Sequence, residues 1–401
     1  MCGIAGYINY KLQDPQKTLL RIKDALHHRG PDDFGIWNNH QAGFCHTRLS
    51  IIDLSEKGRQ PMSDTSNRFK LIFNGEIYNY LQLKKLLPDY HFKTNTDTEV
   101  LLALLLNFSF EEVLQKLEGM YAFSFYDTHE NRLFLARDRL GQKPLLYYIK
   151  NDQLIFGSEF SVFKQFPQFN LKPNPKTLGY YWKYGYIPSP YTAFENIHKL
   201  EPGTFLEFEN GKCQKKIYWQ LNPNENIKIS WDEALFRLEE ILTTSIKNQL
   251  ISDAPLGIFL SGGIDSALIT KIASISTKAK IKTFNLGMND KSFDESMAAQ
   301  NMATALGTEH FQEMISLKIS EDLDQIIHHF GEPFADSSAI PTYYLSKFAA
   351  KHVKVALSGD GADELFGGYY RYAARPLLDN VSLIPAFLRN SFIKTLYLFH
   401  Q

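Results

Sequence analysis

The sequence has few cysteines, no long apolar run and no excess of charge of either sign. Its three cysteines, Cys2, Cys45 and Cys213, are too few for a framework of disulfides and fit a reducing compartment. No apolar run approaches the length that spans a membrane, and the first residues lack the positive segment of a signal peptide. We therefore expect a cytoplasmic protein that neither spans nor binds a membrane.

The balance of charge excludes a further class of function. The 43 basic and 44 acidic side chains leave a formal net charge of −1, and no basic block stands out. Nucleic-acid binding therefore has no electrostatic support in this chain. What the sequence does have is length and aromatic residues. Its 401 residues, with 30 Phe and 21 Tyr, are enough for two domains with large cores.

The segment LGIFLSGGIDS at 256–266 is the clearest functional pattern in the chain. A short apolar run predicts a buried strand, and residues 267–274 predict a helix. The glycine pair between them lets successive backbone N–H groups and the helix N-terminus bind a phosphate. The turn lacks the lysine of a Walker A loop, so a metal ion must supply countercharge, and Asp265 is placed to hold it. The alternative is an ordinary corner in which Ser261 or Asp265 caps the helix.

In the rest of the second half, predicted strands alternate with predicted helices. Strands are expected at 281–286, 309–315 and 353–357, and helices at 231–249, 293–306, 319–330 and 338–352. Such alternation predicts a parallel, doubly wound sheet, in which ligands bind at the carboxyl ends of the strands. The SGGIDS turn lies at such an end, and so does a second loop of glycines and carboxylates at 358–364.

Cys2 is the first candidate nucleophile, because it directly follows the initiator methionine. If Met1 is removed, Cys2 carries a thiol and a free α-amine, and such an amine can act as the base for its own side chain. Its reference pKa of about 8 leaves part of it neutral at neutral pH. Taken singly, each feature of the first half has a simpler explanation. Cys2 is then a small buried thiol, Asn74-Gly75 a turn that ends a strand, and Asp97 a helix cap or a first-turn residue of a helix.

Together, the motifs of the first half resemble the class II (Ntn-type) glutamine amidotransferase domain. They are, in chain order, CGI at 2–4, RGPD at 29–32, RLSI at 48–51, NGEIYN at 74–79, TDTE at 96–99, GMYAF at 119–123, ARDRLGQKPL at 136–145 and FGSE at 156–159. The resemblance implies an α+β fold of four layers (αββα), with two antiparallel sheets sandwiched between helices.

The resemblance also implies roles for individual residues. Cys2 attacks the side-chain amide of glutamine, and Asn74 and Gly75 stabilise the tetrahedral oxyanion. Arg48 binds the α-carboxylate of glutamine, for which a guanidinium is the suited donor, and Asp97 binds its α-ammonium group. The remaining residues implied to bind glutamine are Leu49, Ser50, Ile51, Ile52 and Glu76.

Three motifs of the second half, SGGIDS at 261–266, EPFADSSAIP at 332–341 and SGDGADELFGGY at 358–369, resemble the synthetase domain of asparagine synthetases. SGGIDS is similar to the PP-loop of ATP pyrophosphatases, which cleave ATP between its α- and β-phosphates. The resemblance implies ATP as a substrate, bound by Leu260, Ser261, Gly262, Gly263, Asp265, Ser266, Leu286, Ser358 and Gly359. It further implies Mg²⁺ on Asp265 and Asp363, and a catalytic Asp360 beside the acyl-adenylate.

We therefore expect a glutaminase domain at 1–215, a linker at 216–232 and an ATP-pyrophosphatase type of synthetase domain at 233–401. Ammonia from glutamine would attack β-aspartyl-AMP, giving asparagine, with release of AMP and pyrophosphate. The expected partners are glutamine, aspartate and ATP, and a homodimer is left open. One alternative is an amidotransferase for another carboxylate, such as a sugar uronate. Another is glutaminase activity alone, because the family's synthetase domain continues past SGDGADELFGGY while this chain stops about thirty residues later, incomplete at its C-terminus.

Overall fold

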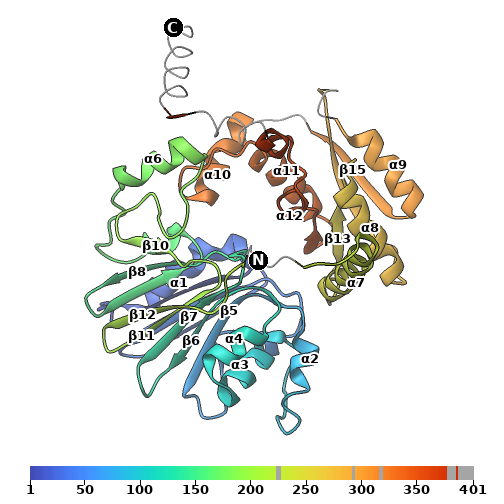
Figure 1. The fold of residues 1–401 in the computed structure, drawn as a ribbon. Helices are drawn as coiled ribbons and strands as arrows, with labels where there is room; N and C mark the ends of the chain where they lie inside the picture. Colours follow the sequence, from blue (N-terminus) through green and yellow to red (C-terminus); the bar gives the residue numbers. More distant parts are fainter. Residues whose placement is uncertain (223–226, 291–293, 316–318, 377–384, 387–401) are drawn as a thin grey trace, which may run out of the picture.

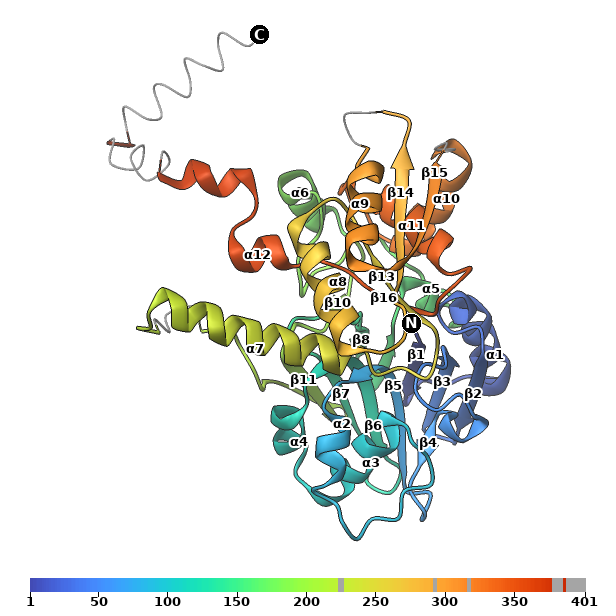
Figure 2. The same ribbon diagram turned by 90° about the vertical axis from the view of Figure 1, so that its right-hand side faces the viewer.

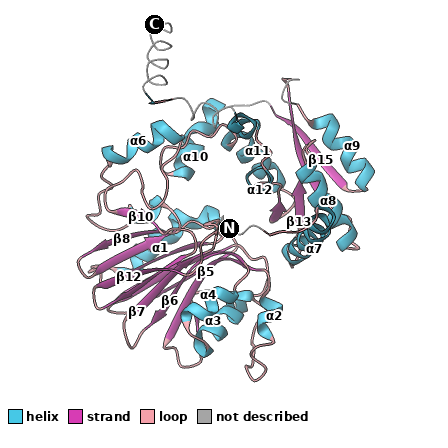
Figure 3. Ribbon diagram, in the orientation of Figure 1, coloured by secondary structure: helices cyan, strands magenta, loops and turns pink. Residues whose placement is uncertain are grey.

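The structure, a computed structural model, describes residues 1–222, 227–290, 294–315, 319–376 and 385–386. Strands dominate the first half of the chain and helices the second (Figure 3). The N-terminus lies where the two halves meet (Figure 1). None of the described helices combines the length and apolar character that crossing a bilayer needs.

The first antiparallel sheet has β1 near its centre. Its six strands run in the order β10 (Ile197–Lys199), β8 (Leu146–Lys150), β9 (Gln153–Gly157), β1 (Gly3–Ile8), β3 (Ala42–Arg48) and β2 (Asp33–Asn38). All six residues of β1 are buried, and the strand pairs with β3 on one side and β9 on the other. Cys2 therefore stands at the entrance to a strand that is held on both edges.

The second antiparallel sheet stacks on the first. Its six strands run in the order β12 (Lys212–Ile217), β11 (Thr204–Glu209), β7 (Arg132–Arg137), β6 (Gly119–Asp127), β5 (Phe69–Ile77) and β4 (Met62–Ser63). One apolar core joins the inner faces of both sheets, with Ile4 and Phe44 from the first packed with Ile72 and Tyr126 from the second. Burial of these faces against each other holds the sandwich together.

Helices cover the outer faces of both sheets. On the first sheet lie α1 (Pro15–Leu26), the short helix η1 (His27–Arg29) and α5 (Phe160–Phe163); on the second lie α2 (Tyr80–Lys84), α3 (Asp97–Asn107) and α4 (Phe110–Lys116). Asp14 caps α1 by accepting from the backbone N–H of Lys17, and Leu19, Ile22 and Leu26 form its buried face. The expected four-layer αββα fold is confirmed. A separate helix, α6 (Pro175–Tyr184), follows α5.

The second half forms the expected parallel sheet, which lies above the two antiparallel sheets in Figure 2. Its strands run in the order β15 (Glu309–Ile315), β14 (Lys282–Met288), β13 (Leu256–Phe259) and β16 (Val355–Leu357). The helices are α7 (Trp231–Gln249), α8 (Ile264–Ser276), α9 (Ser296–Leu306), α10 (Ile319–Phe330), α11 (Ala339–Ala349), α12 (Ala362–Phe366) and η3 (Tyr370–Ala374). Separate apolar cores join β13 to α7 and α8, and β14 to α11, so the sheet is doubly wound.

The expectation that a turn at Asn74-Gly75 ends a strand is wrong. Strand β5 continues to Ile77, and both residues pair with β6, Asn74 opposite Ala122 and Gly75 opposite Tyr121. Pairing along the whole of β6 outweighs the local turn preference of the Asn-Gly pair. The helix expected at 338–352 is shorter, and the strand expected from 353 begins at Val355. The expected helix start at 293 and part of the expected linker, 223–226, lie outside the described residues.

Candidate active site

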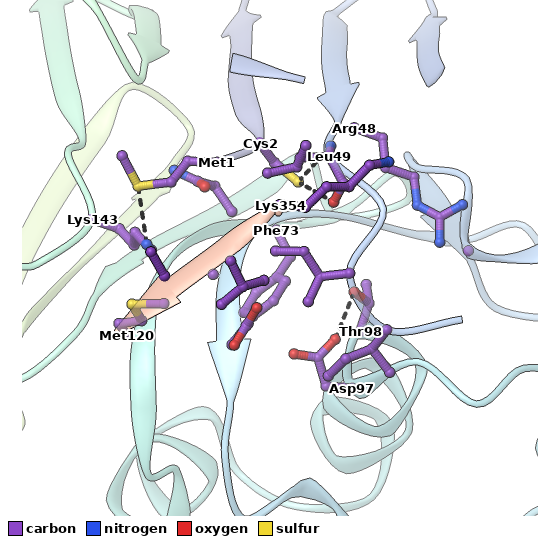
Figure 4. Close-up of a pocket in the computed structure, with 18 of the residues that line it drawn as sticks. Met1, Cys2, Arg48, Leu49, Phe73, Asp97, Thr98, Met120, Lys143 and Lys354 are labelled. Atoms are coloured by element: carbon purple, nitrogen blue, oxygen red, sulfur yellow. Dashed lines mark hydrogen bonds between the residues drawn. The ribbon is translucent and has the colours of Figure 1, made fainter. Parts of the chain in front are cut away.

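A cavity of about 440 Å³ lies at Cys2, between the two halves of the chain (Figure 4). Of the residues predicted to act on or bind glutamine, those on its lining are Cys2, Arg48, Leu49, Ile51, Ile52, Asn74, Gly75, Glu76 and Asp97. Ser50 is not on the lining, and its backbone N–H donates to Asp32 Oδ2. The opposite wall comes from the second half, through Phe259, Ala349, Lys354 and Ala356. The structure thus gathers residues from four separate motifs around one space.

The thiol of Cys2 is held by backbone groups. Its Sγ accepts from the N–H of Leu49 at 3.4 Å and lies 3.7 Å from the carbonyl oxygen of the same residue. Arg29 Nε donates to the Cys2 carbonyl at 3.0 Å, and Arg29 itself is paired with Glu159. Burial raises the pKa of the thiol above its usual value. A thiol with a raised pKa needs a neighbouring base before it can attack.

Met1 occupies the space beside Cys2. Its α-amine has a pKa lowered to about 6 by burial, and its Sδ lies 3.0 Å from Lys143 Nζ (Figure 4). Burial also lowers the pKa of Lys143 to about 8. Met1 lines the cavity at Cys2 and also a second cavity on the side of the nucleotide loops. Any change at Met1 therefore alters both cavities at once.

Asn74 has the environment of an oxyanion-binding group. Its side chain is fully buried on β5, yet neither its Nδ2 nor its Oδ1 has a hydrogen-bond partner in the described part of the chain. Leaving a buried amide unpaired costs about 1–3 kcal/mol, which the fold would avoid unless a ligand supplied the partner. Gly75 follows it on the same cavity wall. The pair can therefore donate to an oxygen that develops negative charge beside Cys2.

Arg48 and Asp97 present opposite charges to the cavity. The Arg48 guanidinium donates to the carbonyl oxygens of Ser55, at 2.6 Å, and Asp53, and a Cβ on Gly58 would come within 2.1 Å of its Nη2. Because these partners are neutral carbonyls, its positive charge is left for a ligand. Asp97 is the first residue of α3 and accepts from the N–H of Ile77 at 3.0 Å. Burial raises its pKa to about 6.

Of the two simpler explanations for Asp97, the helix cap is wrong, whereas a place in the first turn of α3 is confirmed. Thr96 is the N-cap residue of α3, and its hydroxyl accepts from the backbone N–H of Glu99 at 3.1 Å. Asp97 is therefore free of the capping role and directs its carboxylate to β5 and the cavity (Figure 4). Glu76 is a second buried carboxylate on the lining, and burial raises its pKa to about 7.

Sequence reasoning gave no role to Lys143 and Lys354, which also line the cavity. A signal for Lys143 existed, since it belongs to the ARDRLGQKPL motif. The buried carboxylate of Asp138 accepts from the backbone N–H groups of Gln142 and Lys143, both at 2.9 Å, and so shapes that loop. Lys354 stands in no recognisable motif, and only the packing of the two halves brings it to Cys2.

The SGGIDS turn joins β13 to α8 as expected. Gly263 is the N-cap residue of α8 and no side chain caps it, so the capping alternative for Ser261 and Asp265 is wrong. The N–H of Ser261 donates to Ser266 Oγ, that of Gly262 to Glu295 Oε2 and that of Gly263 to Ser261 Oγ, each at 3.1 Å. Three successive N–H groups are thus held by side-chain oxygens, the kind of acceptor that a phosphate can replace.

The two predicted nucleotide loops meet. A Cβ on Gly359 would lie 3.2 Å from Asp265 Cβ and 3.2 Å from the backbone nitrogen of Ser266, so a side chain there would push the two loops apart by a few tenths of an ångström. Leu260 is buried directly after β13, with its N–H bonded to the carbonyl of Phe284, and Leu286 lies farther along β14. The hydroxyl of Ser358 donates to Asp360 at 2.8 Å.

A second cavity, of about 860 Å³, lies between this loop and the first half. Gly359, Asp360 and Asp363 line it from one side, and Arg29 and Glu159 from the other. Within the described ranges, no group of three or more His, Cys, Asp or Glu side chains is arranged to hold a metal ion. A site for Mg²⁺ on Asp265 and Asp363 would therefore need the phosphate oxygens of a nucleotide as further ligands.

Comparison with known proteins gives matches over nearly the whole chain. Residues 1–219 match the family model described as a glutamine amidotransferase domain, and residues 237–398 match the one described as asparagine synthase. The glutamine-hydrolysing asparagine synthetase 1 of Bacillus subtilis is 38% identical over 397 residues, covering 97% of this chain and 62% of that protein. A putative glutamine-hydrolysing asparagine synthetase 2 of Methanocaldococcus jannaschii is 36% identical over 413 residues, covering 97% and 79%.

A more distant relative carries a different name. The amidase chry2 of Gibberella zeae is 30% identical over 425 residues, covering 98% of this chain and 63% of that protein. The chain thus spans about three-fifths of the length of the Bacillus subtilis and Gibberella zeae relatives and about four-fifths of the Methanocaldococcus jannaschii one.

Proposed function

We propose, on the premise that the chain belongs to the family of glutamine-hydrolysing asparagine synthetases, that it uses ammonia from glutamine to convert aspartate to asparagine at the expense of ATP. One observation carries the glutaminase half of this proposal. A thiol, a guanidinium, a carboxylate and a buried amide that has no partner in the described part of the chain line one cavity. They suit, in that order, the side-chain amide carbon, the α-carboxylate, the α-ammonium group and the side-chain amide oxygen of glutamine.

Glutamine hydrolysis would begin with removal of Met1. The freed α-amine of Cys2 takes the thiol proton, and Sγ attacks the amide carbon of glutamine. The side-chain N–H of Asn74 and the backbone N–H of Gly75 stabilise the oxyanion. The C–N bond then breaks, ammonia leaves with a proton from the α-ammonium group, and water hydrolyses the glutamyl thioester to glutamate and the free thiol. Removal of Met1 also enlarges the cavity that it lines.

Substrate recognition in this proposal rests on the two charged groups and the loop between them. Arg48 binds the α-carboxylate and Asp97 the α-ammonium group of glutamine. The segment Leu49, Ser50, Ile51 and Ile52 supplies backbone groups and apolar contact, and Glu76 stands beside the oxyanion hole. Fixing both ends of the amino-acid backbone orients the side-chain amide toward Sγ.

Glutamine binding should weaken when the pH falls below about 6, because the ammonium group needs an ionised Asp97, whose pKa burial raises to about 6. Above that value the carboxylate is charged and Kd should be flat; below it, Kd should rise by about tenfold per pH unit. Calorimetry between pH 5 and 8 on Cys2→Ala, which cannot turn over, measures this. In that background Asp97→Asn should bind weakly at every pH, and Glu76→Gln should leave the break near 6. A flat profile in Cys2→Ala alone would contradict the role of Asp97.

The nucleotide half would bind ATP across the two loops. The proposed contacts are Leu260, Ser261, Gly262, Gly263, Asp265, Ser266, Leu286, Ser358 and Gly359. Two carboxylates plus phosphate oxygens suit Mg²⁺, so Asp265 and Asp363 fit this ion, which would neutralise phosphate charge. The N–H groups of Gly262 and Gly263 exchange their present acceptors for phosphate oxygens. Asp360 lies beside the reacting α-phosphate, at the mouth of the cavity where the acceptor carboxylate would enter.

Replacing Asp265 with asparagine should weaken binding of ATP–Mg²⁺ by about tenfold or more, because the substitution removes a charged ligand and keeps the shape of the side chain. Titration with ATP in the presence and absence of Mg²⁺ measures the effect. Asp89→Asn, which changes an exposed carboxylate in the first half, is the matched control and should bind as the unaltered chain does. Equal Mg²⁺-dependent affinity in Asp265→Asn would remove Asp265 from the metal site.

The proposed function is tested by following all products together. With ATP, Mg²⁺, aspartate and glutamine, the chain should form glutamate, asparagine, AMP and pyrophosphate in parallel. Glutamate without AMP or asparagine would leave a glutaminase alone. The second candidate is a different acceptor carboxylate, such as a sugar uronate; one relative, 30% identical, is named an amidase and not an asparagine synthetase. Pyrophosphate release that depends on such an acid and not on aspartate would select it.

Two further parts of the proposal concern the whole protein. A cytoplasmic location is supported by the small number of cysteines in the sequence. A homodimer is kept as the oligomeric state to be tested, by the mass of the protein in solution.

A further inference from the structure

The loop that carries the proposed glutamine contacts, residues 48–53, is held by the second half of the chain. The backbone N–H of Asp253 donates to the carbonyl of Ile51 at 2.9 Å, and the N–H of Ala254 approaches the same oxygen at 3.3 Å. In return, the N–H of Asp53 donates to Asp253 Oδ2 at 2.8 Å. The outer side of the glutamine loop is therefore bonded to the segment that precedes β13.

An ion pair holds the same loop from a second point. Asp32 Oδ2 accepts from the backbone N–H of Ser50 at 2.8 Å and from Lys354 Nζ at 2.7 Å. One carboxylate oxygen thus bridges the glutamine loop and a lysine of the second half. The backbone N–H of Asp32 donates to the carbonyl of Arg48 at 3.0 Å, so Asp32 is itself fixed to the loop. Lys354 is therefore connected to the loop through Asp32, which is hydrogen-bonded to two residues of the loop.

Both points of attachment lie at the start of a strand that leads to a nucleotide loop. Asp253 and Ala254 precede β13, which leads to the Ser261-Gly262-Gly263 turn. Lys354 precedes β16, which is followed by Ser358-Gly359, and the backbone N–H of Lys354 donates to the carbonyl of Pro255 at 2.9 Å. The two strands pair directly in parallel. At about 3.3 Å per residue, the four residues of β13 span only about 13 Å.

The second half also forms part of the wall around the glutamine cavity. Lys354 and the residues on either side of it, Val353 and Val355, line the cavity with the thiol of Cys2 (Figure 4). A shift of β16 along its axis would move this wall and pull on Asp32 at the same time. Two separate contacts therefore connect the position of β16 to the shape of the glutamine site.

We propose that Lys354 is a positioning residue for glutamine binding, and that through Lys354–Asp32 and Asp253 the nucleotide half sets the affinity of the glutamine loop. The inference rests on the proposed function and adds a regulation of glutamine binding at the cavity of Cys2. Binding of ATP–Mg²⁺ at the ends of β13 and β16 changes the KM for glutamine, and by reciprocity glutamine changes the affinity for ATP. The Lys354 side chain pairs with Asp32, so its proposed role is to position the glutamine loop.

The test uses the full chain and compares Lys354→Met with Lys354→Arg. Lys354→Met should raise the KM for glutamine about three- to tenfold and leave kcat within about twofold, because it loosens the loop and spares the thiol and the oxyanion hole. Lys354→Arg should restore KM, since arginine keeps the charge that Asp32 needs. In the unaltered chain ATP–Mg²⁺ should shift KM at least twofold, and in Lys354→Met this shift should become smaller, because only the connection through Asp253 remains.

Two controls separate positioning from loss of fold. Lys347→Met breaks an ion pair with Asp322 inside the second half and should leave KM and its response to ATP unchanged. Asp32→Asn removes the other partner of the pair and should reproduce the effect of Lys354→Met, with thermal unfolding measured for every variant. An active chain in which Lys354→Met keeps KM and the ATP response would overturn the inference alone. An unaltered chain without glutaminase activity would overturn the proposed function and this inference with it.

Discussion

Cys2→Ala is expected to abolish glutamine hydrolysis, with kcat falling by a factor on the order of 10³ or more, because the variant has no nucleophile. In the unaltered chain, Cys2 shares the cavity lining with Asn74, Arg48 and Asp97. Glutamate release in a coupled assay measures the loss. Amidation driven by added ammonia should persist in the same variant, since the nucleotide loops are untouched.

Cys213→Ala is the matched control for this experiment. Cys213 is exposed on β12, and its removal should leave glutamine turnover unchanged. Mass spectrometry of the active protein should find Cys2 at the N-terminus. Glutamine turnover that survives in Cys2→Ala, or full activity in a protein that retains Met1, would sink the assignment of the nucleophile.

Asn74→Ala is expected to lower kcat for glutamine by about 10²–10³, with KM little changed, because its amide would bind the oxygen more strongly in the transition state than in the substrate. The substitution should cost little or no stability. The Asn74 side chain is buried and has no hydrogen-bond partner among the residues that the structure describes, so its removal breaks no bond there and relieves an unpaired polar group. Kinetics and thermal unfolding on one preparation give both numbers.

Asn79→Ala provides the opposite pattern. Asn79 Nδ2 donates to the carbonyl of Lys116 at 2.9 Å, and its Oδ1 accepts from the N–H of Glu118 at 3.1 Å. Losing these two bonds should lower the melting temperature and leave kcat near its original value. If Asn74→Ala instead behaves like Asn79→Ala, destabilised with kcat intact, Asn74 is a structural residue and the oxyanion hole lies elsewhere.

The parallel sheet of the second half followed from patterns that are local in the sequence, and the αββα fold of the first half from its resemblance to a known domain. Helix α7 has the bounds predicted for it, and the alternation of elements after residue 250 correctly predicts the parallel sheet. The turn at Asn74-Gly75 could not be judged in the same way. Its conformation is decided by β6, more than 40 residues later, which pairs with it residue by residue. A local propensity is a weak guide where a partner strand outweighs it.

The candidate site likewise contains residues that sequence motifs predict and residues that only the tertiary structure brings to it. Cys2, Arg48, Asn74 and Asp97 could be named because each stands in a motif that carries the resemblance to the glutamine amidotransferase domain, and that resemblance implies its role. Lys354 and Asp253 could not, because a lysine and an aspartate ahead of two short strands are ordinary surface residues by sequence. Their significance comes from the contact between the halves, where they meet Asp32 and Ile51. Interactions across such an interface have no periodicity from which they could be predicted.

Met1 lines both the cavity at Cys2 and the cavity at Asp360, and Ser346 is a second residue that the two linings share. Under the proposed mechanism, excision of this one residue creates the base and widens the place where the cavities adjoin. The measured activity of a preparation then depends on the fraction of chains that have lost Met1 as well as on the rate constants. A preparation in which half the chains keep Met1 contains half as many active sites as molecules. Turnover numbers become meaningful only per excised N-terminus, and a co-translational processing step sets the amount of enzyme.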